Sequence, residues 1–528
     1  MDAGRRGRSR RAIAGLTLLG AFAALTAIAY AAAGSLTWVE QDKNGVGGVT
    51  GLDGAIDVAV SPNGANVYAV GTNGAGSLAT FTRNPGTGGL TFLESFIDGV
   101  GGVDGIAGAR GVTVSADGKN VYVTGHGESA LATFTRNPGT GALTWLEMDK
   151  DAVNSVDGIA GAWGLAVSPD DKHVYVAGDL DDAVATFSRN PTTGALTFVE
   201  FDKDGVSGVD GLDIATGVAV SPGAGGNVYV TSCGDSAIAT FSRNATSGAL
   251  TFIEQDKQGV GGVDGMACAR GVAMDQTGAS VYVAAESDDA VTTFARNNTT
   301  GALTFVDTDI DGAGGVDGLN GSRDVATSPD CSSVYTASAV DDAVSTFSRN
   351  PTTGELTFVE QDKDGVGGVD GVDQSVGVTV SPNSANVYSA AEFDDAVATF
   401  TREPSPTPVA GCGSEPPPPG DDPAARTVAL SAKKKVKAGK KVKLSGDLSA
   451  PDDVTGCEAS QTVEVQRKPK KKKAFKPLTS LTTDASGAFS LKTKVKKTTQ
   501  YKAVVAASAD CDGAESPVKK VKAKKKKK

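Results

Sequence analysis

The sequence predicts an all-β fold: a seven-bladed β-propeller closed by an N-terminal outer strand, followed by a small C-terminal β-sandwich. Three observations lead to this prediction. One unit of about 53 residues occurs seven times, short β-branched runs alternate with turn residues, and the chain is rich in Gly (68 of 528 residues) and poor in aromatic residues (6 %). Such a composition favours many short strands over long packed helices.

The repeat is marked most clearly by the phrase A-x-A-T-F-S-R-N and its close variants. Its phenylalanine recurs every 53 or 54 residues, at Phe81, Phe134, Phe187, Phe241, Phe294, Phe347 and Phe400. A fixed period of this length indicates a repeat architecture, in which each unit buries its apolar faces only against its neighbours.

Each unit divides into four short strands, as the fourth unit illustrates. We expect strand A at Gly217–Ser221, strand B at Asn227–Thr231, strand C at Ala237–Arg243 and strand D at Ala249–Glu254. The segments between them hold Pro, Gly, Asn and Asp, which are the residues of tight hairpin turns. Four strands in each of seven units predict a propeller of seven blades.

The two ends of the repeat region predict how the ring closes. Leu36–Glu40 has the pattern of a D strand but precedes any A strand, and the seventh unit ends at its C strand, Ala396–Arg402. We therefore expect these two strands to pair, with Trp38 close to Phe400. Such pairing removes the open sheet edges that would otherwise promote aggregation.

Residues 1–33 have the features of a secretory signal peptide. Five arginines precede an apolar run that ends in Ala-Tyr-Ala-Ala-Ala, and such a basic start, apolar stretch and small-residue site are typical of export signals. An uncleaved membrane anchor is the alternative, and Sec and twin-arginine export both stay open. We expect the protein to be secreted or exposed at the cell surface.

The rest of the chain divides by composition and charge. We expect the propeller at residues 34–403, a Pro-rich linker at 404–425, a β-sandwich at 426–522 and a Lys-rich tail at 523–528. From residue 34 to residue 420 there are 17 Lys and Arg against 50 Asp and Glu, whereas from 421 to 528 there are 28 against 11. Two modules of opposite charge therefore share one chain.

The alternating runs of the C-terminal module resemble a bacterial Ig-like or fibronectin-like sandwich with outward-facing lysines. We expect this basic module to anchor the protein to an anionic cell-surface polymer, without specific binding of nucleic acid. The alternatives are that the lysines only keep the module soluble, or that they dock on the acidic ring of the same or a neighbouring chain.

The strand phrases resemble those of the lactonase-type seven-bladed propellers. The matching segments are S-P-D-D-K-H-V-Y-V-A-G (Ser168–Gly178) and the A-V-A-T-F-S-R-N and P-T-T-G-A-L-T-F phrases that follow it. That family includes 6-phosphogluconolactonases and a fungal carboxymuconate cycloisomerase, so the resemblance implies the fold and metal-free lactone chemistry. This chain departs from those enzymes because its blades are nearly identical, whereas enzyme propellers diverge between blades to build an asymmetric site.

The residue that leads into strand A varies most between units: Ile56, Arg110, Trp163, Thr216, Arg270, Arg323 and Val376. We expect these side chains to surround the mouth of the central channel. There Arg110, Trp163, Arg270 and Arg323 would bind a small anionic or sugar-like ligand, because guanidinium groups pair with carboxylates. The alternative is that each arginine only neutralises nearby aspartates.

Three function classes follow from these features. The leading hypothesis is an exported, surface-associated module that binds a ligand or another surface protein through its acidic loop face. The alternative is a lactone hydrolase of the 6-phosphogluconolactonase type, with His126, Arg110, Arg270 and Arg323 as its catalytic residues, His126 being the only imidazole expected on the channel face. A purely structural role is the third class. His173 is expected in an A–B turn on the opposite face, without a role.

The acidic loops between units suggest a candidate metal site. No cofactor is required by the sequence, but the loop after the third unit holds Asp202, Asp204 and Asp210, and alternating carboxylates with glycine can surround Ca²⁺. The alternative is a solvated acidic turn whose aspartates bond their own backbone.

Six cysteines accompany the predicted export, which permits disulfides. We expect Cys233 to pair with Cys268, because both should lie on the channel face. Cys457 and Cys511 are expected to pair in the C-terminal module. Cys331 and Cys412 are left over and are expected to lie far from each other.

Overall fold

The computed structural model describes residues 32–223, 226–405, 409, 412, 427–449, 461–469, 474–484, 488–505 and 514–524. The predicted signal peptide (apart from its last two residues), most of the predicted linker and the end of the Lys-rich tail lie outside these ranges. Within them the chain is all-β except for one 3-10 helix, η1 (His126–Glu128). No helix in the described ranges is long and apolar enough to cross a membrane.

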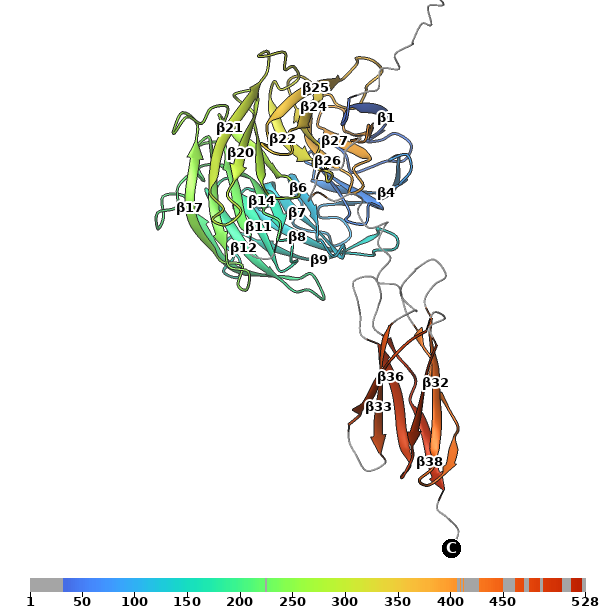
Figure 1. Ribbon diagram of the computed structural model, residues 1–528. Coiled ribbons are helices and arrows are strands. Elements are labelled where there is room, and N and C mark those ends of the chain that lie inside the picture. Colours follow the sequence, from blue (N-terminus) through green and yellow to red (C-terminus); the bar gives the residue numbers. More distant parts are fainter. Residues whose placement is uncertain are drawn as a thin grey trace, which may run out of the picture.

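Seven four-stranded antiparallel sheets form a ring of blades (Figure 1), with strand A of each blade innermost and strand D outermost. Blade 1 contains β2 (Ala55–Val60), β3 (Asn66–Gly71), β4 (Ser77–Arg83) and β5 (Leu90–Ile97). Blade 2 contains β6 (Ala109–Val114), β7 (Asn120–Gly125), β8 (Ala130–Arg136) and β9 (Leu143–Lys150). Blade 3 contains β10 (Ala162–Val167), β11 (His173–Gly178), β12 (Ala183–Arg189) and β13 (Leu196–Lys203).

The next three blades follow the same order. Blade 4 contains β14 (Ala215–Val220), β15 (Asn227–Ser232), β16 (Ala237–Arg243) and β17 (Leu250–Lys257). Blade 5 contains β18 (Ala269–Met274), β19 (Ser280–Ala285), β20 (Ala290–Arg296) and β21 (Leu303–Ile310). Blade 6 contains β22 (Ser322–Thr327), β23 (Ser333–Ser338), β24 (Ala343–Arg349) and β25 (Leu356–Lys363).

Blade 7 is built from both ends of the repeat region. It contains β26 (Ser375–Val380), β27 (Asn386–Ala391), β28 (Ala396–Arg402) and, as its outer strand, β1 (Leu36–Lys43). β1 and β28 are antiparallel, with Trp38 opposite Phe400. The predicted closure of the ring by the first strand is therefore confirmed.

The outer strands extend further than the sequence predicted. Strand D of blade 4 reaches Lys257 rather than Glu254, because a β-bulge next to Phe241 lets the strand continue along the whole of β16 until Lys257 pairs with Ala237. A bulge of this kind adds one residue to a strand without ending the pairing. As a consequence, Asp202 and its equivalents, predicted in loops, lie inside the outer strands.

Each blade is tied to the next by a buried arginine and a buried tyrosine. Nε of Arg189 in β12 donates to the phenol oxygen of Tyr122 in β7 at 2.7 Å, and the Tyr122 hydroxyl donates to the carbonyl of Gly194 at 3.0 Å. The same arginine–tyrosine hydrogen bond occurs at all seven junctions between blades. The repeat phrases N-V-Y and F-S-R-N therefore supply the contacts between blades as well as the strands.

His173 belongs to this arrangement. It is the first residue of β11 rather than part of a turn, it is buried, and its Nδ1 lies 2.7 Å from Nη2 of Arg243. In other blades Asn120 and Asn227 occupy the equivalent position and accept a hydrogen bond from the arginine of the next blade. Burial and the Arg243 charge lower the pKa of His173, so this imidazole has a structural role between blades 3 and 4.

The C-terminal module consists of two sheets. One contains β29 (Thr427–Val428), β30 (Ser431–Ala432), β32 (Lys441–Ser449) and β35 (Ala488–Lys494). The other contains β31 (Lys435–Lys437), β33 (Thr462–Pro469), β34 (Lys476–Thr482), β36 (Thr499–Val505), β37 (Ala514–Glu515) and β38 (Lys519–Lys524). Their apolar faces share one core that includes Leu444, Val465 and Tyr501. A small β-sandwich is thus present, while its likeness to the Ig class stays a prediction.

Two disulfides lie in the described part of the chain. Cys233 is bonded to Cys268, as predicted. The expectation that Cys331 and Cys412 lie apart is wrong, because they form the second disulfide. Arg402 at the end of β28 donates to Asp330 at 2.8 Å, so the chain leaves the ring beside blade 6, the blade that contains Cys331. Cys457 and Cys511 lie outside the described residues.

Candidate functional site

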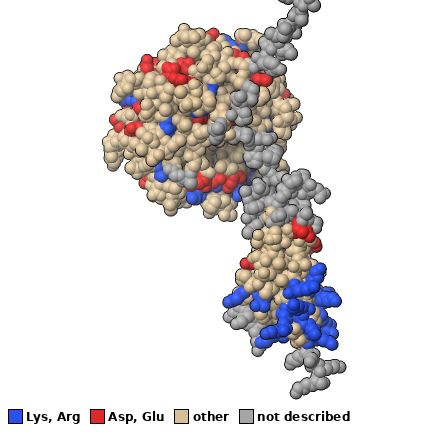
Figure 2. Space-filling view, in the orientation of Figure 1, with Lys and Arg blue, Asp and Glu red and all other residues tan. Residues whose placement is uncertain are grey.

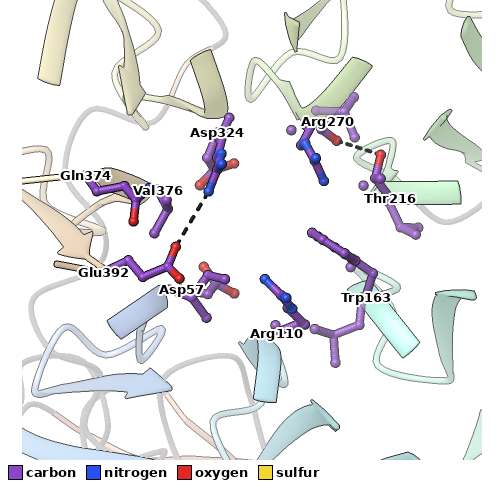
Figure 3. Close-up of a pocket in the computed structure, with 18 of the residues that line it drawn as sticks. Asp57, Arg110, Trp163, Thr216, Arg270, Asp324, Gln374, Val376 and Glu392 are labelled. Carbon is purple, nitrogen blue, oxygen red and sulfur yellow. Dashed lines mark hydrogen bonds and ion pairs between the residues drawn. The ribbon is translucent and has the colours of Figure 1, made fainter. Parts of the chain in front are cut away.

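The seven residues that lead into the A strands surround one cavity of about 590 Å³ at the mouth of the channel (Figure 3). They are Ile56, Arg110, Trp163, Thr216, Arg270, Arg323 and Val376. The A strands place them there because these strands form the inner wall of the ring, and each carries its variable residue at its second position. The sequence pattern therefore located the cavity correctly.

Arg110, Trp163 and Arg270 form a stack on one side of the cavity. The guanidinium carbon of Arg110 lies 4.5 Å from the centroid of the Trp163 ring, and that of Arg270 lies 5.0 Å from it. Figure 3 shows the indole edge-on between the two guanidinium groups. Cations over an indole face are held by its electron-rich surface, so two positive groups are fixed about one flat aromatic ring.

Two glutamates that the sequence analysis missed partner the other arginines. Glu286 pairs with Arg270 and, at 2.9 Å, with Arg323, while Glu392 lies 3.6 Å from Arg323. Burial opposes ionisation of Glu286, but the charges of Arg270 and Arg323 outweigh it and lower its pKa. This network holds Arg270 and Arg323 in place.

Arg110 differs from the other two arginines. Among the described residues it has no hydrogen-bond or ion-pair partner, and its Nε is buried. Burial and the neighbouring Arg270 and Arg323 lower the pKa of Arg110. The cavity therefore contains one guanidinium group whose hydrogen-bonding capacity is unused inside the protein.

A second variable position explains how the glutamates could have been found. The first residue after strand B also varies, with six residue types in seven units: Thr72, His126, Asp179, Cys233, Glu286, Ala339 and Glu392. This position follows the strand that pairs with strand A, so it lies beside the cavity mouth. Variation at a fixed place in an otherwise regular repeat is the signal that sequence analysis did not use here.

Asp57 and Asp324 break the repeat in the wall of the cavity. The residue after the variable strand-A position is glycine in five blades and aspartate only in β2 and β22. Asp57 accepts hydrogen bonds from the backbone N–H of Val58 and of Val112, both at 2.8 Å. Burial raises the pKa of Asp57 to about 8, with Asp324 adding to the shift, and burial raises that of Asp324 to about 6.

His126 stands behind Trp163 and is not among the residues that line the cavity. Its ring contacts the Trp163 ring edge-on, with centroids 5.6 Å apart, and its Nε2 lies 3.1 Å from Asp179 Oδ2. In this position the imidazole supports the indole. A catalytic role for His126 stays a prediction.

The predicted metal ligands are only partly brought together. Carboxylate oxygens of Asp204 and Asp210 lie within 4.8 Å of one another and of Asp235, and four similar trios occur in other blades. Asp202 is not part of the trio, because it lies in β13 opposite Val184. Lys257 Nζ already lies 2.6 Å from Asp235 and supplies the positive charge that a cation would bring, so these residues fit Ca²⁺ poorly.

A ring of seven antiparallel sheets around a polar, blade-specific channel mouth defines a seven-bladed β-propeller. The chain matches the lactonase, 7-bladed beta-propeller family over residues 23–156, 96–209 and 152–318, which together exceed half of its 528 residues. It belongs to this family, and the predicted resemblance is confirmed. No curated protein matches it.

Several solved structures are similar to this chain. A candidate 6-phosphogluconolactonase of Bacteroides fragilis has 18 % identity and a TM-score of 0.48, over 61 % of this chain and 85 % of that one. The periplasmic gluconolactonase of Pseudomonas aeruginosa has 18 % identity and a TM-score of 0.47, over 59 % and 85 %. Hydrazine synthase of Kuenenia stuttgartiensis has 17 % identity and a TM-score of 0.49, over 69 % and 99 %. At such identities no activity passes from them to this chain.

Proposed function

We propose that the channel mouth binds a small organic anion, whose carboxylate or phosphate group contacts Arg110 and whose sugar-like part lies against Trp163. The observation that carries this proposal is Arg110, whose guanidinium group has no hydrogen-bond or ion-pair partner among the described residues. Holding a guanidinium group in a partly buried site beside two other cations costs free energy, and an anionic ligand with two acceptor oxygens offsets that cost.

The rest of the cavity supports the same ligand class. Glu286 and Glu392 neutralise Arg270 and Arg323, so these arginines are already positioned before a ligand arrives. Such pre-organisation lowers the entropy cost of binding. A cavity of about 590 Å³ is within the range of small-molecule sites.

Calorimetric titration with sugar acids and sugar phosphates, and with the uncharged parent sugars as controls, tests this proposal. We expect Arg110→Gln to weaken anion binding by at least tenfold, as loss of a charged hydrogen bond does. Lys119→Gln is the matched control, since it removes one positive charge from an exposed turn. The proposal fails if no anion binds, or if Arg110→Gln binds as tightly as the natural protein.

Lactone hydrolysis is the second candidate, and membership of the lactonase family together with the carboxyl groups in the cavity favours it. Water would attack the lactone carbonyl, and the ring C–O bond would break to give a hydroxy acid. The arginines would stabilise the negative oxygen that forms, and Glu392 would accept a proton from the attacking water and pass it to the ring oxygen as the C–O bond breaks.

A screen of lactones with Glu392→Gln and His126→Ala tests catalysis separately from binding. We expect Glu392→Gln to remove turnover. Loss of turnover in His126→Ala with unchanged substrate affinity would favour the imidazole as the base instead. If no lactone is hydrolysed but anions bind at Arg110, the protein is a binding module and the second candidate is discarded.

We also propose that the protein acts outside the cytoplasm, as a secreted or surface-exposed binding module. The two disulfides of the described residues support this location, because such bonds persist mainly in oxidising compartments. Fractionation of the producing cells tests it, and recovery of the intact chain in the cytoplasm alone would overturn it.

A further inference from the structure

The C-terminal module carries a dense group of exposed lysines, which we call the lysine surface. Figure 2 shows Lys and Arg gathered at one end of this module. The lysine surface comprises Lys433, Lys434, Lys435, Lys437, Lys440, Lys441, Lys443, Lys492, Lys494, Lys496, Lys497, Lys519, Lys520, Lys522 and Lys524. None of these side chains has an ion pair among the described residues.

The strand register places many of these lysines directly opposite one another. In one sheet the opposed pairs are Lys441–Lys494 and Lys443–Lys492, and in the other they are Lys435–Lys522 and Lys437–Lys524. Val442 and Leu444 are buried between the lysines of β32, which keeps the charged side chains outward. Like charges directly opposite each other destabilise a sheet, so the module carries a repulsion that a bound anion would relieve.

We infer that the lysine surface binds a flexible, linear polyanion. Cross-strand partners lie about 5 Å apart, and lysines two positions apart on a strand lie about 7 Å apart. The surface therefore repeats positive charges every few ångströms, close enough for one polyanion chain to contact several lysines at once. It contains no arginine, and lysine acts as a point charge without the fixed planar geometry of a guanidinium group.

The shape of the lysine surface favours a flexible chain over a flat or rigid partner. The four opposed pairs lie on the outer faces of two different sheets, so a bilayer would contact only one set at a time. Val518 is the one large apolar side chain of the described module that is strongly exposed, which leaves little to insert into a membrane. Tyr501 and Phe489 are buried, and the ring of Phe475, the third aromatic residue of the described module, already contacts Lys468 and Lys502, so little aromatic surface is left for stacking on nucleic-acid bases.

This inference does not depend on the proposed function of the channel, since it concerns the other module. Binding of the full chain to inorganic polyphosphate and to polygalacturonate is measured across a range of salt concentrations. Anionic phosphatidylglycerol vesicles and duplex DNA are measured alongside as a flat and a rigid polyanion. We expect polyphosphate or polygalacturonate to bind more tightly than both the vesicles and the duplex DNA. Comparison of polyphosphate with polygalacturonate shows whether phosphate or carboxylate groups are preferred.

The variant Lys441→Gln/Lys494→Gln removes one opposed pair without adding repulsion, so it keeps the module folded. We expect its affinity for polyphosphate to fall by roughly tenfold and the salt slope to become shallower by about 0.7 for each lysine. Lys119→Gln/Lys172→Gln removes the same charge from exposed propeller turns and should stay within about twofold of the natural protein.

Three results would overturn the inference. The first is absence of binding to either linear chain at low salt. The second is tighter binding to vesicles or DNA than to both linear chains. The third is a dimer of the full chain that the Lys441/Lys494 variant abolishes while polyphosphate does not bind, because the partner of the lysine surface would then be a second copy of the acidic propeller.

Discussion

Arg83 in blade 1 donates from Nε to the phenol oxygen of Tyr388 in blade 7 at 2.7 Å, and the Tyr388 hydroxyl donates to the carbonyl of Gly88 at 2.7 Å. These residues are some 300 positions apart in sequence. The closing junction thus has the same buried hydrogen bonds as the junctions inside the chain, in addition to the pairing of β1 with β28. The ring is therefore closed in its core as well as at its outer edge.

This closure predicts that Tyr388→Phe and Tyr122→Phe destabilise the propeller equally. Each substitution leaves a buried arginine Nε and a glycine carbonyl without a partner, and we expect each to cost about 1–3 kcal/mol. Urea denaturation of both variants checks this. If Tyr388→Phe left the free energy of unfolding unchanged while Tyr122→Phe lowered it, the ring would be open between the first and last blades.

Alanine substitutions at two glycines should distinguish the cost of a steric clash from the cost of backbone strain. Gly141 has φ +77°, and a Cβ added there would lie 1.9 Å from Nδ2 of Asn66, whereas Gly47 has φ +62° and open space around it. We expect Gly47→Ala to cost about 1–2 kcal/mol from left-handed strain alone. Gly141→Ala should cost clearly more, because it also displaces the amide that binds Arg136. Equal losses in thermal denaturation would contradict the close contact between blades 1 and 2.

Stability should fall as the pH rises from about 4 to about 7. Burial, with a neighbouring acidic residue adding to it, raises the pKa of six outer-strand aspartates to about 6 or 7: Asp42, Asp149, Asp202, Asp256, Asp309 and Asp362. Their unfolded pKa is about 3.9, so in this window the folded state holds more protons than the unfolded state. The contribution of these aspartates to stability is therefore highest at and below the unfolded pKa. It is lost as the pH rises from the unfolded pKa to the folded pKa.

The variant Asp256→Asn isolates this effect, since asparagine resembles the protonated carboxyl group. We expect its melting temperature to exceed that of the natural protein at pH 8 and to match it near pH 3, below the unfolded pKa of about 3.9. Asp53→Asn, at an exposed position, serves as the control and should change little at either pH. A natural protein that melts at higher temperature at pH 8 than at pH 5 would contradict the prediction.

We expect the Cys233–Cys268 disulfide to support anion binding at the channel mouth, and the Cys331–Cys412 disulfide to have little effect on it. Cys268 precedes the strand that carries Arg270, its Sγ lies 3.7 Å from Oε2 of Glu286, and its carbonyl accepts the Glu286 N–H. Replacing Cys233 and Cys268 by serine should therefore weaken anion binding about threefold to tenfold. The matching double substitution at Cys331 and Cys412 should leave affinity within about twofold. Calorimetry with the tightest sugar acid compares the two, and equal effects would argue against a positioning role for the first disulfide.

Much of the site could be predicted because it follows the repeat. Arg110, Trp163, Arg270 and Arg323 occupy one position of a regular unit, and identical units must place that position around the axis of the ring. Glu286 and Glu392 were not predicted, because a carboxylate in an acidic loop is common in a sequence of this composition. The fold is what brings an arginine of a neighbouring blade close to each of them. The Cys331–Cys412 bond escaped prediction because it depends on where the chain leaves the closed ring.

The sequence alone determined the number of blades, the strands within them and the strand that closes the ring. A local unit repeated seven times has apolar faces that only its own copies can cover, so these features need no knowledge of distant contacts. Tertiary structure decided which charges meet across blades and which carboxyl groups lose water. It also decided that, among the described residues, Arg110 has no hydrogen-bond or ion-pair partner while Arg270 and Arg323 are paired. Those outcomes depend on distances of a few ångströms between residues far apart in the chain, which a sequence pattern does not specify.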